Sequence, residues 1–338
     1  MSTPIRIAID TMGGDLGPDP IVSAALQLLD SLPSIHTVLV GDEQQISPLL
    51  KPLKQETLNR IELVHASDVV SMSDKPSVVL RHKQNSSMWI ALDLVKEKKV
   101  DACVSAGNTG ALMAMGKYLL KTFPGIERPA ICKPVPSSKG QCYLLDLGAN
   151  INCTAEQLVQ FAFMGSVLAM VSDSNPKPSV GLLNIGEENI KGIEQVRVAA
   201  DILNTSDQIN YAGFVEGNDI YTGDVDVIVC DGFVGNIALK VSEGAAKFLA
   251  ENIKAAFTKS WYGRLAGLFA YPVVSSWREK YNPVRHNGAC FLGLQGTVIK
   301  SHGGTDALGF YHALLMAVNH VKNQIPEKIN LQFEELFV

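Results

Sequence analysis

Long apolar runs, an N-terminal basic stretch followed by an apolar core, and Cys-x-x-Cys pairs are all missing from this 338-residue sequence. Its apolar runs stay well below the roughly 18 residues that suggest a transmembrane segment. No basic stretch followed by an apolar core precedes the strand-like run at residues 5–9, so we expect no secretory signal and a soluble, cytoplasmic protein. None of the six cysteines forms a Cys-x-x-Cys pair, and all lie in or beside apolar runs, which argues against a disulfide framework or a zinc site.

An excess of positive charge is missing as well. The chain has 29 lysines and arginines against 34 aspartates and glutamates, which gives a formal net charge of -5. A mildly acidic chain without a basic stripe has no general attraction for nucleic acid, so we expect no nucleic-acid partner. Hydrophobic residues make up 46% and charged residues 19% of the chain, which is typical of a folded globular protein and not of a disordered one.

Two nucleotide-binding signatures are also absent. The sequence Gly-x-x-x-x-Gly-Lys-Ser/Thr does not occur, and no Gly-x-Gly-x-x-Gly follows the first strand-like run. These absences argue against a P-loop nucleotide enzyme and against a standard dinucleotide-binding fold.

What the sequence does contain is an alternation of short apolar runs and longer helical patterns. Near-continuous apolar runs are typical of central strands that are buried on both faces. We therefore predict one α/β domain over residues 1–338, with a mostly parallel sheet covered by helices on both faces and an apolar helical excursion at about 254–286. The apolar runs lie at residues 5–9, 38–40, 102–104, 143–145, 180–183, 227–229 and 297–299, and helical periodicity at 21–32, 155–171 and 192–203.

A small, polar, glycine-bearing loop ends nearly every apolar run. In a parallel sheet such loops gather at one edge, the carboxyl ends of the strands, where open α/β folds bind ligands. Glycine lets backbone N–H groups approach an anion, and a following helix N-terminus adds further donors. The set therefore predicts a phosphate-binding pocket built from the loops at 10–15, 105–110, 146–150, 184–187, 216–219, 231–236 and 302–306.

The loop at 105–110 illustrates two interpretations of such a segment. Asn108 and Thr109 could give side-chain donors to an anion, or one of them could simply cap the helix that follows. For any single loop the capping interpretation is sufficient, whereas so many loops at one edge favour a pocket.

Charged side chains near these loops have alternative interpretations too. Lys191, Lys240 and His302 could face an anion, or they could be two solvated lysines and a hydrogen-bonded loop histidine. We expect the acidic loop residues, such as Asp10, to cap helices or orient cations; a divalent-metal site is an alternative that no fixed ligand spacing supports. We interpret Cys153 as a packing residue because no histidine is adjacent in sequence to make it a nucleophile.

Seven segments, taken in order, resemble one known family, the bacterial acyl carrier protein–dependent phosphate acyltransferases called PlsX. The chain departs from the family pattern at Thr11, where alanine is expected, and at Gly304 and Thr305, where a pair of serines is expected. The segments cover the chain nearly end to end: 9–15 (IDTMGGD), 104–112 (VSAGNTGAL), 145–150 (LDLGAN), 183–192 (LNIGEENIKG), 213–218 (GFVEGN), 226–240 (DVIVCDGFVGNIALK) and 299–306.

The resemblance implies a three-layer α/β/α fold related to phosphotransacetylases and isocitrate dehydrogenase-like enzymes. It implies a reaction in which fatty acyl–acyl carrier protein and inorganic phosphate give acyl phosphate and free carrier. It also implies a homodimer, peripheral association with the inner face of the membrane, and a downstream membrane acyltransferase that uses the product for phosphatidic acid and phospholipid synthesis.

The chemistry of that reaction suits a site made mainly of hydrogen-bond donors. A phosphate oxygen attacks the thioester carbonyl, and a thiolate whose conjugate thiol has a pKa of about 8.5 leaves with little acid help. Positioning and electrostatic stabilisation are then sufficient, without a metal or cofactor. We expect Lys191 or His302 beside the developing oxyanion and Asp306 orienting His302. The candidate catalytic residues are Lys191, His302, Asp306 and Asn236; the candidate substrate-binding residues are Asp10, Gly13, Gly14, Gly107, Asn108, Thr109, Gly148, Asn150, Asn184 and Gly235.

Three other functions stay open at this point. A phosphotransacetylase would act on a short acyl–coenzyme A and would need an acetyl-sized pocket. A hydroxyacid dehydrogenase on the same fold would need bound nicotinamide and a metal ion. A non-catalytic membrane scaffold would show no turnover at all.

Two surface segments are candidates for protein and membrane contact. The basic cluster at residues 81–83 suits an acidic carrier protein, with Arg81 and Lys83 as candidate contacts, although a solvated helix face is the alternative. Residues 261–277 are apolar and aromatic, and we expect Leu265, Leu268 and Phe269 to contact a membrane surface. A buried hairpin in the core or at a dimer interface is the alternative. We also expect Pro272 to break this stretch into more than one helix.

Overall fold

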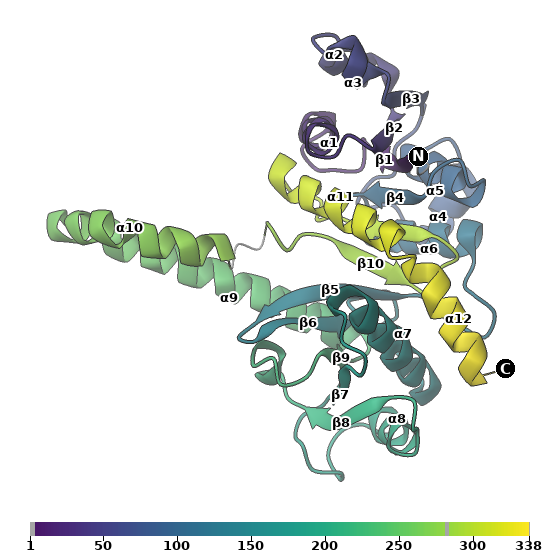
Figure 1. The fold of residues 1–338 in the computed structure, drawn as a ribbon, viewed down its shortest axis with the longest axis vertical. Helices are drawn as coiled ribbons and strands as arrows, with labels where there is room; N and C mark the ends of the chain where they lie inside the picture. The colour runs from purple at the N-terminus through teal and green to yellow at the C-terminus, as the bar shows by residue number, and fades with distance from the viewer. Residues whose placement is uncertain (1–3, 281–283, 338) are drawn as a thin grey trace.

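Eleven strands form one sheet in the computed structural model, which describes residues 4–280 and 284–337 (Figure 1). The strand order is β3-β2-β1-β4-β11-β10-β5-β6-β9-β7-β8. The strands are β1 Ile5–Asp10, β2 Ile35–Gly41, β3 Ile61–His65, β4 Ala102–Ser105, β5 Ala130–Ser137, β6 Gly140–Leu145, β7 Ser179–Leu183, β8 Asn210–Val215, β9 Val227–Val229, β10 Ala289–Leu292 and β11 Thr297–Lys300.

Helices cover both faces of this sheet. They are α1 Pro18–Ser31, α2 Glu43–Leu50, α3 Gln55–Leu58, α4 Pro76–His82, α5 Ser87–Lys96, α6 Thr109–Leu120, α7 Ala155–Asp173, α8 Glu194–Asn204, α9 Gly232–Thr258, α10 Trp261–Lys280, α11 Ala307–Lys322 and α12 Ile325–Phe337, with a short 3₁₀ turn η1 at Asp219–Tyr221.

Alternating side chains along the strands give the sheet two separate apolar faces. Along β1, Ile7 and Ile9 pack into one core cluster while Ala8 packs into the other. The first cluster includes residues of α1, α7 and α11, and the second includes residues of α5 and α6. The three-layer α/β/α architecture is therefore confirmed, and the apolar runs named above are its buried central strands.

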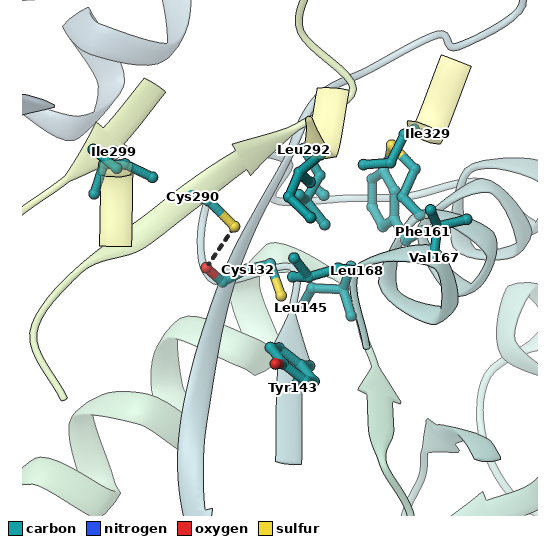
Figure 2. Packing of buried hydrophobic residues seen from close by; sticks show 14 of the residues in the cluster. Cys132, Tyr143, Leu145, Phe161, Val167, Leu168, Cys290, Leu292, Ile299 and Ile329 are labelled. Carbon is teal, nitrogen blue, oxygen red and sulfur yellow. Dashed lines mark hydrogen bonds between the residues drawn. The ribbon is translucent and has the colours of Figure 1, made fainter. Parts of the chain in front are cut away.

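The cysteines pack as small apolar side chains. Five of the six are buried, Cys153 is half-buried, and all six are free thiols. Figure 2 shows Cys290 of β10 donating a 3.4 Å hydrogen bond to the carbonyl oxygen of Cys132 in the neighbouring β5.

The sheet consists of two parallel blocks that run in opposite directions. Strands β3, β2, β1, β4 and β11 are parallel to one another, and so are β6, β9, β7 and β8. Between the blocks, β11–β10, β10–β5 and β5–β6 are all antiparallel, and three reversals leave the blocks opposed. The expectation that every loop lies at one edge of a single parallel sheet is therefore wrong, although the sheet is mostly parallel.

The strand register explains how loops from both blocks still meet. Lys300, the last residue of β11, is opposite Ala289 of β10. The next β10 residue, Cys290, pairs with Cys132 of β5, and Cys132 pairs with Leu145, the last residue of β6. The carboxyl ends of β11 and β6 therefore lie within one residue of the same level. The loops that follow these two strands meet near the middle of the sheet, although the strands belong to opposed blocks.

Helix α7 is the one described helix that is long and apolar enough to cross a membrane by length and composition. Of an 18-residue apolar stretch of this helix, 72% is buried inside the structure. Its capping box at Thr154 and Gln157 begins a helix whose buried residues lie all round, as expected for a helix enclosed in a core.

Helices α9 and α10 form a hairpin that projects away from the rest of the molecule (Figure 1). The apolar excursion predicted at about 254–286 includes the end of α9 and all of α10. The expectation that Pro272 breaks the helix is wrong, because α10 continues through it. Proline removes one backbone donor, and on an exposed helix the carbonyl oxygen that loses its partner can bind water instead.

Candidate active site

A pocket of about 920 Å³ lies where the ends of the two strand blocks meet the first half of α9. Loops from both blocks line it: Thr109 follows β4, Gly148 follows β6, Asn236 lies in the first turn of α9 after β9, and His302 follows β11. Four candidates that are far apart in the sequence are thus brought together in one cavity.

The polar end of this pocket is positively charged. Among the described lining residues are four lysines, Lys133, Lys240, Lys247 and Lys300, and a single carboxylate, Glu243. Glu243 is shared, because its Oε2 lies 2.9 Å from Lys240 Nζ and its Oε1 lies 3.8 Å from Lys133 Nζ. Burial lowers the pKa of Lys133, and the carboxylate of Glu243 acts in the opposite direction. An excess of lysines over carboxylates in a concave site attracts anions.

Another part of the wall is apolar. Leu239, Ala246, Leu249 and Ala250 of α9 line the cavity together with Val284 and Ala289. The pocket therefore combines a place for an anion with a place for a hydrocarbon, which is the usual composition of a small-molecule site.

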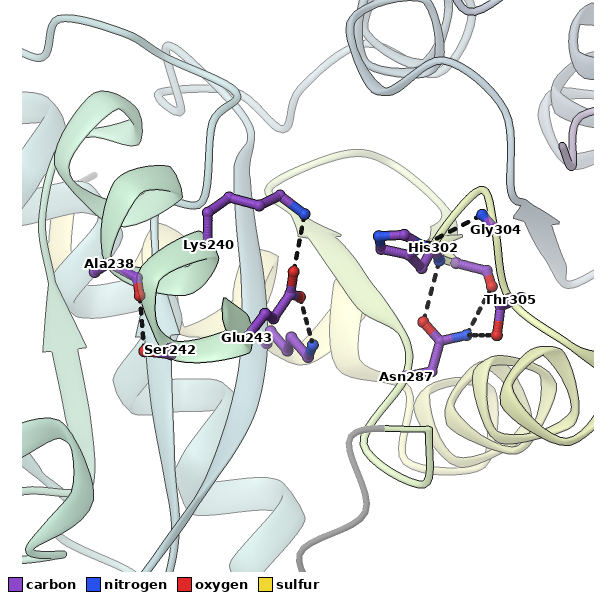
Figure 3. A network of polar contacts seen from close by, with 10 residues as sticks. Ala238, Lys240, Ser242, Glu243, Asn287, His302, Gly304 and Thr305 are labelled. Atoms are coloured by element: carbon purple, nitrogen blue, oxygen red, sulfur yellow. Dashed lines mark hydrogen bonds and ion pairs between the residues drawn. The ribbon is translucent and has the colours of Figure 1, made fainter. Parts of the chain in front are cut away.

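Asn287 and Gly304 hold His302 in place. The backbone N–H of His302 donates to Asn287 Oδ1 at 3.1 Å, and the N–H of Gly304 donates to His302 Nδ1 at 3.2 Å (Figure 3). Asn287 Nδ2 in turn donates to Ser301 Oγ at 2.8 Å and to the carbonyl oxygen of Gly309 at 2.9 Å.

This arrangement defines the protonation of His302. Desolvation, followed by the nearby Lys240 ammonium, lowers the pKa of His302. Because Nδ1 accepts a hydrogen bond, the proton of the neutral ring is on Nε2. His302 therefore offers the pocket an N–H donor and no full positive charge.

Asp306 has a different role from the predicted one. Its Oδ1 accepts a 2.9 Å hydrogen bond from Gly309 N and caps α11. Among the described residues no hydrogen bond joins Asp306 to His302, and Asn287 and Gly304 hold the loop histidine instead.

Asn108 is a helix cap whose whole side chain is engaged. Its Oδ1 accepts from Ala111 N at 3.0 Å, and its Nδ2 donates to the carbonyl oxygens of Ser71, Met72 and Asp74 at 3.3, 2.9 and 3.1 Å. The capping interpretation is confirmed for Asn108. The neighbouring Thr109 is the residue of this loop that reaches the pocket.

Asp146 shapes the loop after β6. Its Oδ1 accepts from the backbone N–H groups of Ile131 and Ala149, and its Oδ2 accepts from both the backbone and the side chain of Asn150. Burial raises the pKa of Asp146, and these four hydrogen bonds favour the ionised form. Gly148 has a φ of +119°, which favours glycine, and an added Cβ there would make an ordinary contact of 3.6 Å with the Asn236 Cβ.

Asp10 has a similar supporting position below the loop after β4. It is buried, and its two carboxylate oxygens accept 2.6 Å hydrogen bonds from Ser87 Oγ and Ser105 Oγ. Gly107 N donates to Ser105 Oγ at 3.0 Å, and a Cβ on Gly13 would lie 2.7 Å from Gly107 N. Asp10, Gly13 and Gly107 therefore fix the loop and do not line the cavity. Gly14 is likewise packed, against Ile21.

Lys191 and Asn184 lie outside the pocket lining. Lys191 Nζ pairs with Glu188 Oε2 at 2.7 Å, and Asn184 Nδ2 donates to the carbonyl oxygens of Gly186 and Lys191. Hydrogen bonding to Glu188 raises the pKa of Lys191. Both residues belong to the loop after β7, which the structure does not bring to His302.

Cys153 also lies outside the pocket lining. Its Sγ donates to the carbonyl oxygen of Asn150 at 3.6 Å, and burial, followed by the charge of Asp146, raises the pKa of its thiol to about 12. A thiol that stays protonated at neutral pH is a poor nucleophile.

Among the pocket residues that sequence reasoning missed are Lys133, Asn287 and Lys300. Lys133 carried a usable signal, because it is a charged residue inside the otherwise buried strand β5. Lys300 carried a weaker one, as a lysine directly between an apolar run and His302. Asn287 follows the apolar excursion and has no motif around it.

The metal-ligating residue types do not converge anywhere in the described chain. Over residues 4–280 and 284–337, no group of three or more His, Cys, Asp or Glu side chains is placed to hold a metal ion.

The candidate surface residues differ in whether they are paired or exposed. Lys83 Nζ pairs with Asp68 Oδ1 at 2.7 Å, while Arg81 is exposed at the end of α4. Leu265, Leu268 and Phe269 of α10 are 49%, 70% and 82% exposed. The side chain of Trp277 lies outside the described residues.

Comparison with known proteins covers nearly the whole chain. A family model described as "Fatty acid synthesis protein" matches residues 5–328. A phosphate acyltransferase of Methylococcus capsulatus is 52% identical over 331 residues, which are 98% of this chain and 97% of the relative. A phosphate acyltransferase of Hydrogenovibrio crunogenus is 53% identical over 325 residues, with 96% of each chain covered.

Solved structures show the same fold at low identity. A phosphotransacetylase from Streptococcus pyogenes is similar with a TM-score of 0.65 at 14% identity, covering 95% of both chains. The EutD phosphotransacetylase from Staphylococcus aureus has a TM-score of 0.59 at 17% identity, covering 94% of both chains. A 4-hydroxythreonine-4-phosphate dehydrogenase from Klebsiella pneumoniae has a TM-score of 0.52 at 12% identity, covering 95% of this chain and 98% of its own.

Proposed function

Because the chain belongs to the phosphate acyltransferase family, whose members transfer acyl groups, we propose that its acyl donor is a fatty acyl–acyl carrier protein. The acceptor is inorganic phosphate, and the product is an acyl phosphate used for phosphatidic acid and phospholipid synthesis. The single observation that best supports this proposal is the pocket, which joins a lysine-rich polar end to an apolar wall.

The pocket residues divide the work of the reaction. A phosphate oxygen forms the new bond to the thioester carbon, negative charge develops on the carbonyl oxygen, and the carbon–sulfur bond then breaks to release a thiolate. His302 Nε2–H and the Asn236 side chain stabilise that oxygen, while Thr109 and the helix N-terminus it begins contact phosphate. Removing one such donor from an oxyanion site typically costs about 10²–10³ in turnover.

An anionic nucleophile and a thiolate leaving group need no cofactor for this step. The attacking phosphate oxygen is already charged near neutral pH, and the departing thiolate is stable enough to leave unprotonated. The protein's contribution is to position both reactants and to stabilise charge.

The decisive assay measures free thiol released from a long-chain acyl carrier protein, with and without inorganic phosphate. The proposal predicts release that depends on phosphate and forms acyl phosphate in equal amount. Release from acetyl–coenzyme A alone would instead indicate a phosphotransacetylase. A change in NADH absorbance with a hydroxyacid, NAD and magnesium would indicate the dehydrogenase.

The proposed partners follow from the two exposed surfaces. Arg81 is available to the acidic carrier protein, with Lys83 beside it in its pair with Asp68. The α9–α10 hairpin carries the exposed apolar side chains that we assign to a second copy of the chain and to the inner face of the membrane. We propose a cytoplasmic homodimer that associates peripherally with the membrane and delivers acyl phosphate to a membrane acyltransferase.

A further inference from the structure

Lys300 is the pocket lysine at the carboxyl end of β11, where the first strand block meets β10. It ends β11, where it is opposite Ser105 of β4 on one side and Ala289 of β10 on the other. Its Nζ donates to the carbonyl oxygen of Ala106 at 3.2 Å and to the carbonyl oxygen of Ser301. An ammonium group has three N–H donors, so one donor remains beyond these two carbonyls.

Side-chain hydrogen bonds fix the turn that carries the Ala106 carbonyl, one of the two acceptors of Lys300. Asp10 accepts a hydrogen bond from Ser105 Oγ, and the same Oγ accepts one from Gly107 N, so the turn that carries the Ala106 carbonyl has little freedom. Asp10 is buried and its pKa is raised by that burial. The buried carboxylate of Asp10 and its two serine partners, Ser87 and Ser105, therefore position the turn whose carbonyl accepts from Lys300.

Unlike Lys133 and Lys240, Lys300 has no direct counter-ion among the described residues. Lys133 and Lys240 both pair with Glu243, whereas within the described ranges no carboxylate lies within 4.0 Å of Lys300 Nζ. Burying an ammonium group without a paired anion is costly. Desolvation accordingly lowers the pKa of Lys300 to about 8, the more distant Asp10 and Asp15 raise it, and Lys240 lowers it further. An anion in the pocket would supply the missing charge.

We propose that Lys300 binds the phosphate of the reaction, its free N–H donating to a non-attacking oxygen of inorganic phosphate and then of the acyl phosphate product. This inference rests on the proposed function and deepens it by naming the cation. Lys300 keeps its proton throughout: the new bond forms between a phosphate oxygen and the thioester carbon, and the carbon–sulfur electrons leave with the thiolate.

The test replaces Lys300 by methionine, which has similar length and no charge. A charge-assisted hydrogen bond to a phosphate is expected to be worth a ten- to hundredfold change in affinity, so the KM for phosphate should rise by about that factor in Lys300→Met. The KM for the acyl donor should change by no more than about threefold, because the proposed contact is made to phosphate alone, whereas a loss of folded enzyme would lower turnover without raising either KM. Lys139→Met, which removes an exposed lysine paired with Asp224, is the matched control and should leave both constants unchanged.

The pH dependence of phosphate binding gives a second test. With the pKa of Lys300 at about 8, affinity for phosphate should fall as the pH rises from 7 to 9, and Lys300→Met should lack this alkaline loss. A wild-type affinity that is flat over this range, or a Lys300→Met variant with an unchanged phosphate KM, would overturn the proposal.

Calorimetric titration with inorganic phosphate alone separates this inference from the proposed function. If wild-type protein binds phosphate, Lys300→Met does not, and acyl carrier protein is never turned over, the function is wrong and the phosphate site stands. If turnover occurs and both proteins bind phosphate equally well, the function stands and the role of Lys300 is lost.

Discussion

The thiol of Cys153 separates two routes for acyl transfer. A covalent route needs a thiolate within reach of the substrate, whereas Cys153 is half-buried, has its pKa raised to about 12, and lies outside the pocket lining. Direct attack by phosphate makes the thiol dispensable.

Replacing Cys153 by alanine should therefore leave activity within about threefold of the parent, because only a small packing contribution is lost. The measurement is the phosphate-dependent release of carrier thiol, combined with mass spectrometry of enzyme quenched during turnover. An acyl group trapped on Cys153 at a rate that matches turnover would show that the direct route is wrong.

His320 makes the stability of the protein depend on pH. It is buried in α11, and desolvation lowers its pKa from 6.5 to about 4. The unfolded chain therefore binds a proton at this position before the folded chain does, and stability falls as the pH drops from about 6.5 towards about 4. The difference in pKa corresponds to a loss of roughly 3 kcal/mol.

His320→Leu removes this titration. Urea unfolding of both proteins at pH 7 and at pH 4.5 should give a smaller acid-induced loss of unfolding free energy for the variant. The comparison between proteins cancels the other groups that titrate in this range. Equal losses would show that His320 is protonated in the folded state.

Single residues also show how far the sequence could predict the site. Thr109, Gly148, Asn236 and His302 could be found because each lies in or just after a glycine-bearing segment that follows a strand, and that local pattern is visible in the sequence. Lys300 had only a weak signal, its place directly before His302, because what makes it unusual is the absence of a counter-ion among residues that are distant in the sequence.

At the scale of elements, local patterns predicted the strands and helices but not their directions. The runs at 102–104 and 227–229 are buried strands as expected, because apolar continuity is a property of the segment itself. Strand β10 has four residues and pairs with β11, which follows it after a short turn, and with β5, which is remote in sequence. Its position between the two blocks therefore depends on the tertiary contact with β5. The loop after β7 leaves the same edge as the loops after β6 and β9, because β7 is parallel to both. It stays outside the pocket lining because β7 lies further from the junction of the two blocks than β6 and β9 do.

The first turn of α9 depends on a glycine that packs against the loop after β6. A Cβ on Gly235 would clash with the carbonyl oxygen of Asp146 and lie 2.9 Å from Cys230 Sγ. Gly235→Ala should therefore lower the unfolding free energy by about 1–3 kcal/mol, as overpacking of a tight contact does, and reduce turnover because Asn236 moves with the turn.

Gly244 is a matched control on the same helix, since an added Cβ there meets nothing within 4 Å. Gly244→Ala should raise stability by roughly 0.5–1 kcal/mol, because alanine favours the helix. Urea unfolding and the thiol-release assay check both variants. Equal stabilisation by the two alanines would mean that the contact with Asp146 does not constrain α9.

Helix α4 provides the proposed contact for the carrier protein. Arg81→Gln should raise the apparent KM for acyl carrier protein and weaken its dependence on salt, because exposed charges mainly affect encounter with an acidic partner. Steady-state kinetics at low and high salt measure both effects, with Lys139→Gln as the control for loss of an exposed charge. An unchanged salt dependence would favour a helix face that is only solvated.

For the whole molecule, the α9–α10 hairpin is unusual because its apolar side chains are exposed and do not pack on the sheet. A core buries its apolar residues, yet the hairpin presents Phe248 and Leu249 on α9 and Leu268, Phe269 and Val273 on α10, all 55% or more exposed. So large an exposed apolar set marks an interaction surface. Lys254, Lys259 and Arg264 near the turn of the hairpin suit anionic lipid headgroups.

Leu268→Glu combined with Phe269→Glu separates the two proposed uses of this surface. If α10 contacts the membrane, the double variant should stay active and should remain a folded dimer in analytical ultracentrifugation. It should bind vesicles that contain anionic lipid at least tenfold more weakly than the parent, because two carboxylates replace two of the most exposed apolar side chains of α10. Leu331→Glu, which places a charge on the exposed part of α12, should bind vesicles as the parent does. If the double variant dissociates instead, and the parent binds neither anionic nor neutral vesicles, then this face of α10 belongs to the second copy, and the route of the acyl phosphate to the membrane must lie elsewhere on the molecule.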